Sequence, residues 1–279
     1  MFCKNKFWNR INHSSKKYLS YLIPLYYINN KNRPALLGTA LLIRINDKYF
    51  ILTAAHVIDE NKYSTIYYPG KNKLKILNTV FETISLPESR NREDDIYDFA
   101  FSILNNSIVN ELKNKFSFFP VNRIDPNDIP SKDKFYTIIG FPGTKSSAIP
   151  SLKKIKSKAF AFTSVSDEKS YKKIGVSDRT HLVLNFDKKE SLNSEANKFT
   201  SPDPHGMSGG GVWLSRIIQP NKVKETNKLI GLGIEYRKSL NILVAVKMSL
   251  ILECIRKKYP GLNKYIPKCN ILKINVNFD

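Results

Sequence analysis

The chain has 279 residues, enough for one or two domains with a full hydrophobic core. Hydrophobic residues make up 42% of the sequence and aromatic residues 11%, which is typical of a globular protein and excludes a disordered chain. The formal net charge of +21 makes a nucleic acid or another polyanion a partner to consider. The basic residues are spread out and do not interleave with aromatic residues, however, so a solvated surface is favoured over a nucleic-acid site.

The cysteines and the apolar runs bear on the cellular compartment. Cys3, Cys254 and Cys269 are an odd number without disulfide or metal spacing, which favours a reducing compartment. We expect no metal and no cofactor. The apolar run at residues 19–27 is too short to span a bilayer and is interrupted by Pro24, and no signal-peptide core precedes it. The sequence therefore predicts a cytoplasmic protein that is not bound to a membrane.

The first half of the chain is predicted to consist of short strands. An N-terminal extension is expected over residues 1–30, with its aromatic run packed on the outside of the following lobe. The strongly charged stretch 86–95 is predicted to be an exposed loop. Two mostly apolar runs flank the polar pair Asn46-Asp47, a pattern that predicts a β-hairpin. The predicted strands are 38–45, 48–53, 64–68, 74–81 and 98–104, a spacing typical of a barrel or sandwich.

The second half follows a proline-rich connection at residues 119–134. The polar stretch 187–201 is interpreted as a loop over the cleft. A helix is predicted over residues 248–258, because apolar residues recur there at helical spacing and basic residues occupy the last turn. Further strands are predicted at 135–141, 159–165, 181–186, 229–236 and 241–246, and the alternating segment 271–276 is a candidate for pairing with a sheet edge.

The stretch D-P-H-G-M-S-G-G-G-V-W, residues 203–213, carries a candidate nucleophile, Ser208. Gly206 precedes this serine and three glycines follow it, so the backbone can turn sharply there. A hydroxyl that attacks a carbonyl needs N–H groups to hold the developing oxyanion, and Gly206 and Ser208 offer theirs. Glycine and serine are also common in ordinary loops. The interpretation of Ser208 as a nucleophile therefore depends on a histidine base and on a carboxylate that orients that histidine.

The base and the acid come from the first half of the chain. His56 lies in F-I-L-T-A-A-H-V, at the end of an apolar run. Asp98 lies in D-D-I-Y-D-F-A-F, where a charge set into an apolar strand is costly without a partner. Asp94 and Asp95 compete for the acid role, but they precede the strand. No histidine follows Ser208, so the order of α/β-hydrolases is excluded and the order His56, Asp98, Ser208 remains.

Together, L-T-A-A-H-V, D-F-A-F and G-M-S-G-G resemble the three signature segments of trypsin-like (chymotrypsin-fold) serine peptidases of the intracellular or bacterial type. The resemblance covers roughly residues 38–246. It implies an all-β fold of two antiparallel six-stranded β-barrels with a C-terminal helix. The implied division is an N-terminal extension 1–30, a first lobe 31–120 with His56 and Asp98, a linker 121–135, a second lobe 136–247 with Ser208, and a helix and tail 248–279.

The resemblance also implies an activity. His56 would be the general base, Asp98 its orienting acid and Ser208 the nucleophile of a serine endopeptidase that forms an acyl-enzyme. The N–H groups of Gly206 and Ser208 would form the oxyanion hole. The sequence departs from the family's digestive members at Met207, where they carry an aspartate that receives a new amino terminus. Activation by that ion pair is therefore not available to this chain.

Substrate contacts are implied by the same alignment. Ile234, Glu235 and Tyr236 would form the wall of the specificity pocket. Asp203 would favour a basic substrate side chain, and His205 is either a substrate contact or a simple turn residue. The expected partners are a protein or peptide substrate and a regulatory protein. Two alternatives stay open: a non-catalytic protease-like module that binds a peptide or protein, and a basic nucleic-acid-binding protein.

Overall fold

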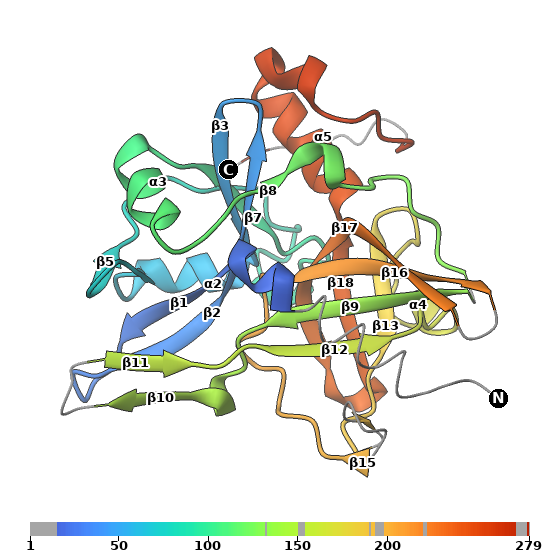
Figure 1. Ribbon diagram of the computed structural model, residues 1–279, viewed down its shortest axis with the longest axis horizontal. Coiled ribbons are helices and arrows are strands. Elements are labelled where there is room, and N and C mark those ends of the chain that lie inside the picture. The colour runs from blue at the N-terminus through green and yellow to red at the C-terminus, as the bar shows by residue number, and fades with distance from the viewer. Residues whose placement is uncertain are drawn as a thin grey trace.

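The computed structural model describes residues 16–131, 133–149, 154–189, 191–192, 198–219, 222–271 and 278 of the chain. Two curled, mainly antiparallel sheets dominate it, and helix α5 (Met248–Lys258) follows them in the chain (Figure 1). We call the sheet from the N-terminal half, with its helices, the first lobe and the sheet from the C-terminal half the second lobe. The expected fold class, all-β with a C-terminal helix, is confirmed.

The first lobe is an eight-stranded sheet with the order β5-β4-β1-β2-β3-β7-β6, in which β8 pairs in parallel with β2. The expectation of six strands is wrong for this lobe. Four of its strands contain only two or three residues, and the two shortest, β6 and β8, were not predicted because two residues show no pattern in the sequence. The strands are β1 (Leu22–Ile28), β2 (Pro34–Ile45), β3 (Lys48–Thr53), β4 (Tyr67–Pro69), β5 (Leu74–Ile76), β6 (Glu82–Thr83), β7 (Ala100–Ile103) and β8 (Phe119–Pro120).

The hairpin of β2 and β3 forms where the sequence predicts it. Its ladder runs from Ile45 opposite Lys48 to Leu41 opposite Leu52. Asn46 takes a left-handed conformation with φ of 54°, which the tight turn requires and asparagine tolerates. Alternate β2 side chains enter two different hydrophobic clusters, so the strand is apolar on both faces because both faces are buried.

Strand β1 corrects the expectation for the N-terminal segment. Instead of packing on the outside of the lobe, β1 lies between β4 and β2, and its Leu22, Ile23 and Leu25 are fully buried. Pro24 has no N–H to donate, but it stands opposite Thr39, whose backbone N–H and carbonyl bond to residues outside β1. The proline therefore costs the sheet no ladder hydrogen bond at this position.

The second lobe has the six strands expected of it, in the order β12-β9-β16-β17-β18-β13. The strand pairs are antiparallel throughout. Two small hairpins, β10 with β11 and β14 with β15, stand outside the two large sheets. The strands are β9 (Lys134–Gly140), β10 (Ser146–Ile149), β11 (Lys154–Ser157), β12 (Phe160–Ser164), β13 (His181–Asn185), β14 (Ser191–Leu192), β15 (Lys198–Phe199), β16 (Gly211–Gln219), β17 (Lys222–Arg237) and β18 (Ile242–Lys247).

Among the described residues, helices α2, α3, α4 and α5 accompany the strands. Helix α5 begins and ends at the residues that the sequence predicts, and its apolar face packs on the core shared by both lobes. Helix α3 (Asn106–Lys113) was not expected, although Asn105 caps it by accepting a hydrogen bond from the Ile108 N–H at 3.0 Å. The other two are α2 (Ala55–Asp59) and α4 (Ser170–Lys173).

Part of the C-terminal tail can be compared with expectation. The alternating segment predicted for residues 271–276 lies almost entirely outside the described residues, but Phe278 forms an antiparallel bridge with Ile84 of the first lobe. Among the helices in the described ranges, none has both the length and the apolar character needed to cross a bilayer.

Candidate active site

His56 and Asp98 meet at one end of the first lobe. Strand β3 ends at Thr53 and α2 carries His56, while Asp98 lies two residues before β7, the strand that pairs with β3. His56 Nδ1 is 2.6 Å from Asp98 Oδ2, and the His56 backbone N–H donates to Asp98 Oδ1 at 2.8 Å. Asp98 is buried, whereas the His56 side chain is 44% exposed. The carboxylate therefore holds one side of the ring and leaves Nε2 facing outward.

The pair shifts the titration of both groups. Partial burial lowers the pKa of His56, but the hydrogen bond and negative charge of Asp98 outweigh this effect, and the pKa is raised above its ordinary value of 6.5. Burial raises the pKa of the Asp98 carboxyl, although its bonds to His56 act in the opposite direction. The imidazole is thus a stronger base than a free histidine, and its Nδ1–H points at the carboxylate.

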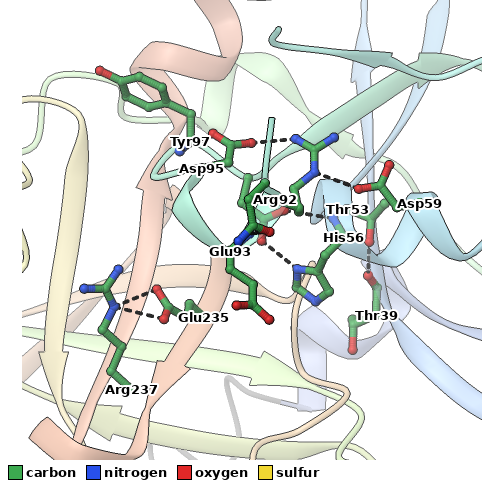
Figure 2. A network of polar contacts seen from close by, with 12 residues as sticks. Thr39, Thr53, His56, Asp59, Arg92, Glu93, Asp95, Tyr97, Glu235 and Arg237 are labelled. Carbon is green, nitrogen blue, oxygen red and sulfur yellow. Dashed lines mark hydrogen bonds and ion pairs between the residues drawn. The ribbon is translucent and has the colours of Figure 1, made fainter. Parts of the chain in front are cut away.

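A second set of charges holds the loop that leads to Asp98 (Figure 2). Arg92 Nε donates to Asp59 Oδ2 at 2.7 Å, and Arg92 Nη1 donates to Asp95 Oδ2 at 2.6 Å. Asp95 also accepts the Tyr97 backbone N–H through Oδ1 at 2.9 Å. The expectation of an exposed loop is wrong for Arg92 and Asp95, whose side chains are 15% and 5% exposed, because their charges satisfy each other. Asp95 is therefore engaged elsewhere and Asp98 faces the histidine.

His181 ties the same loop to the second lobe. It is fully buried at the start of β13, and its Nε2 donates to the Ile96 carbonyl at 2.7 Å. Its Nδ1 lies 2.8 Å from Thr180 Oγ1, which donates to it because the other nitrogen carries the proton. Burial lowers the pKa of His181 to about 4, so the ring is neutral at physiological pH. The side chain is a packed imidazole that joins the two lobes.

The turn around Ser208 requires glycine at two positions. Gly206 and Gly209 have φ of +92° and +88°, a region that side chains disfavour. A Cβ on Gly209 would lie 1.8 Å from the Thr39 carbonyl oxygen, and one on Gly206 would lie 2.9 Å from the Phe141 carbonyl oxygen. Glycine therefore lets the turn of the second lobe approach the backbone of β2 in the first lobe.

Most N–H groups of this turn have an acceptor. Those of Met207, Gly209 and Gly210 donate to Pro204, Gly233 and Met207 carbonyls at 2.7–2.8 Å. In the described part of the chain, the N–H groups of Gly206 and Ser208 have no such bond.

The direction of these two N–H groups is fixed by the other ends of their peptide units. The His205 carbonyl accepts from the Gly143 N–H at 2.8 Å, and the Met207 carbonyl accepts from the Gly210 N–H at 2.8 Å. The N–H and C=O of a trans peptide point in opposite directions, and no cis peptide occurs among the described residues. The N–H groups of Gly206 and Ser208 therefore point away from these anchored carbonyls and are available to another acceptor.

One pocket of about 240 Å³ brings the site residues together. It is lined by His56 from the first lobe and by Ser208 from the second. All five residues suggested as substrate contacts also line it, together with apolar residues that were not predicted to line a pocket. The further lining residues are Asp203, His205, Ile234, Glu235, Tyr236, Ile138, Pro204, Met207, Gly233 and Leu243.

Neither of the two described cysteines, Cys254 and Cys269, lines this pocket. Burial raises the pKa of the thiols of Cys254 and Cys269 to about 12, so both stay protonated and are poor nucleophiles. Cys3 lies outside the described residues. Within the described ranges, no three side chains of His, Cys, Asp or Glu gather in a way that could hold a metal ion.

The sequence matches no protein-family model and no curated protein. Solved structures do match. The protease Anisep from Arthrobacter nicotinovorans is 10% identical with a TM-score of 0.50, over 86% of this chain and 94% of that one. A Glu endopeptidase in complex with MPD is 16% identical with a TM-score of 0.45, over 85% and 90%. A chain from work on the VPg protein of Sesbania mosaic virus is 15% identical with a TM-score of 0.44, over 83% and 94%. With its two antiparallel lobes and C-terminal helix, the protein has a chymotrypsin-like fold.

Proposed function

We propose that this protein is a serine endopeptidase that uses His56, Asp98 and Ser208 as its catalytic triad. One observation carries the proposal: His56 and Ser208, which come from different lobes, line one pocket, and the ring of His56 is held by the buried Asp98. A histidine oriented in this way can take a proton from a serine hydroxyl, which is otherwise a weak nucleophile. Nothing in this arrangement needs a metal or a cofactor.

The reaction proceeds in two steps. In the first, Ser208 Oγ attacks the scissile carbonyl while its proton passes to His56 Nε2, and the tetrahedral intermediate collapses as His56 returns that proton to the leaving amine. In the second, water attacks the acyl-enzyme while its proton passes to His56 Nε2, and the new tetrahedral intermediate collapses as His56 returns that proton to Ser208 Oγ and the acid leaves. Asp98 stays ionised and stabilises the imidazolium formed in each step.

Two backbone N–H groups in the turn around Ser208 support the same proposal. Those of Gly206 and Ser208 would hold the oxyanion of the tetrahedral intermediate, because both are unpaired in the described structure and both are fixed in direction. Preorganised donors stabilise the transition state without reorganising during the reaction. This arrangement favours catalysis over the alternative of a peptide-binding module that has lost its chemistry.

An open strand edge suggests how a peptide would be bound. Strand β16 pairs with β17 up to Gly211 opposite Leu232, so within the described part of the chain no strand pairs with this edge of β17 beyond Gly233, along the pocket. A substrate would add to this edge as an extra strand, with Ile234, Glu235 and Tyr236 beside it. Asp203, whose side chain is 40% exposed at the pocket, would favour a basic substrate side chain.

The test is labelling with a fluorophosphonate probe, which reacts with activated serines. Wild type should label at Ser208, as located by mass spectrometry, and labelling should vanish in Ser208→Ala and His56→Ala. Peptide turnover should fall by on the order of 10⁶-fold in the same variants, since the triad acts as a unit. Ser107→Ala, which removes an exposed serine of α3, is the matched control and should label like wild type. A folded Ser208→Ala protein that still cleaves peptides at the wild-type rate would refute the proposal.

A further inference from the structure

Thr39 of the first lobe stands at the point where the two lobes meet. The ladder between β2 and β3 ends at Leu41 opposite Leu52, so the backbone groups of Thr39 lie beyond it. Its N–H donates to the Ser208 carbonyl at 2.9 Å. Its carbonyl accepts from Thr53 Oγ1 at 2.7 Å, as Figure 2 shows. Thr39 is fully buried, so every polar group it carries has to find a partner inside the protein.

The hydroxyl of Thr39 joins two segments of the second lobe. Oγ1 accepts from the Phe141 N–H at 2.9 Å and donates to the Gly206 carbonyl at 2.9 Å. Because an N–H can only donate and a carbonyl can only accept, the direction of both hydrogen bonds is fixed. A single hydroxyl therefore satisfies two buried backbone groups that would otherwise have no common partner.

These contacts fix both peptide units that flank the Gly206 Cα. The unit before it is anchored by the bond from Gly143 to the His205 carbonyl. The unit after it is anchored by the bond from Thr39 to the Gly206 carbonyl and by the Met207 N–H, which donates to Pro204. Gly206 has φ of +92° and no side chain, so these anchors hold its N–H in place. Of them, Thr39 is the one contributed by the first lobe.

We infer that Thr39 is a positioning residue for the oxyanion hole, acting through its hydroxyl on the peptide units around Gly206. The inference rests on the proposed function. Met207, which precedes the candidate nucleophile, is 2% exposed and packs its backbone against Gly140, where a Cβ would lie 2.9 Å from the Met207 Cα. An uncharged packing contact and a threonine hydroxyl thus hold the turn without an ion pair.

The experiment compares Thr39→Val, which removes the hydroxyl at nearly constant volume, with Thr39→Ser, which keeps it. Thr39→Val should lower kcat by about 10- to 100-fold with KM changed by less than about threefold, because the loss affects the transition state. Thr39→Ser should stay within about threefold of wild type. The matched control is Thr53→Val, which removes the neighbouring buried hydroxyl but leaves the bonds to Gly206 and Phe141 intact, and it should also stay within about threefold.

A second readout separates positioning from misfolding. The ratio of turnover of an ester to that of the matching thionoester is independent of how much protein is folded. Sulfur accepts hydrogen bonds weakly, so an intact oxyanion hole gives a high ratio, and Thr39→Val should lower it by about tenfold while Thr39→Ser and Thr53→Val do not. If Thr39→Val does not fold, Thr39→Ala carries the same test without the added methyl group.

The outcomes are distinguishable. Wild type that neither reacts with the fluorophosphonate nor hydrolyses the ester overturns the proposed function and this inference with it. If wild type is active, and if kcat and the ratio of ester to thionoester turnover are unchanged in Thr39→Val or Thr39→Ala, the inference is overturned and the proposed function stands. A loss in Thr53→Val as large as that in Thr39→Val would show a general packing role and would also overturn it.

Discussion

The buried His181 should make the protein sensitive to acid in a way that one substitution removes. Burial holds the pKa of His181 at about 4 in the folded chain, against 6.5 when it is solvated. A depressed pKa contributes stability that is present above pH 6.5 and is lost as the pH falls towards 4. The difference of about 2.5 units, at about 1.4 kcal/mol per unit, amounts to about 3 kcal/mol of unfolding free energy. His181→Gln keeps a donor for the Ile96 carbonyl but does not titrate.

The assay is urea unfolding of wild type and His181→Gln at a series of pH values from 7 to 4, followed by tryptophan fluorescence. Other groups contribute to the acid response of both proteins, so the difference between the two curves reports His181. Wild type should lose about 3 kcal/mol more than the variant between pH 7 and pH 4. Parallel curves would refute the reasoning, because they would mean that His181 takes up its proton equally well in the folded and unfolded chain.

Three further predictions concern the candidate site. The kcat/KM for peptide hydrolysis should rise with pH, with a midpoint above 6.5, because the raised pKa of His56 must be passed before the ring can act as a base; a midpoint below 6.5 would contradict this. Asp98→Asn should lower kcat by about 10⁴-fold with little change in Tm, measured with a peptide substrate and by calorimetry. Gly209→Ala should destabilise the protein by about 2–5 kcal/mol in urea unfolding, because the new Cβ meets the Thr39 carbonyl at positive φ; Gly261→Ala, where a Cβ meets nothing within 4 Å, is the control.

Local signals explain the parts of the fold that the sequence predicts. The β2 and β3 hairpin and helix α5 are each encoded by residues close together in the chain, through alternation around Asn46 and through helical spacing before a basic last turn. Helix α3 has comparable signals, a capping Asn105 and apolar residues at helical spacing, although no helix was predicted between the strand at 98–104 and the connection at 119–134.

Tertiary context explains the parts that the sequence does not predict. The inner position of β1 depends on partners from β2 and β4 and on the unused ladder position opposite Pro24. In the sequence, Arg92 is one of several charged residues in a predicted exposed loop. Its partner Asp59 is distant in the chain, so the ion pair between them cannot be predicted from local sequence. The same holds for the candidate site. Sequence motifs identify His56 and Ser208, but no local pattern in the sequence indicates that the Thr39 hydroxyl anchors the turn around Ser208.

The division of the site between the lobes has a consequence for protein synthesis. While the ribosome is still translating the second lobe, the emerging chain already carries His56 and Asp98 but has no nucleophile to activate. Ser208, β17 and the helix that covers the shared core all follow later in the chain. Under the proposed mechanism, proteolytic activity can therefore appear only after the second lobe has been synthesised and has folded against the first. The order of the elements thus delays the assembly of the candidate triad until both lobes are present.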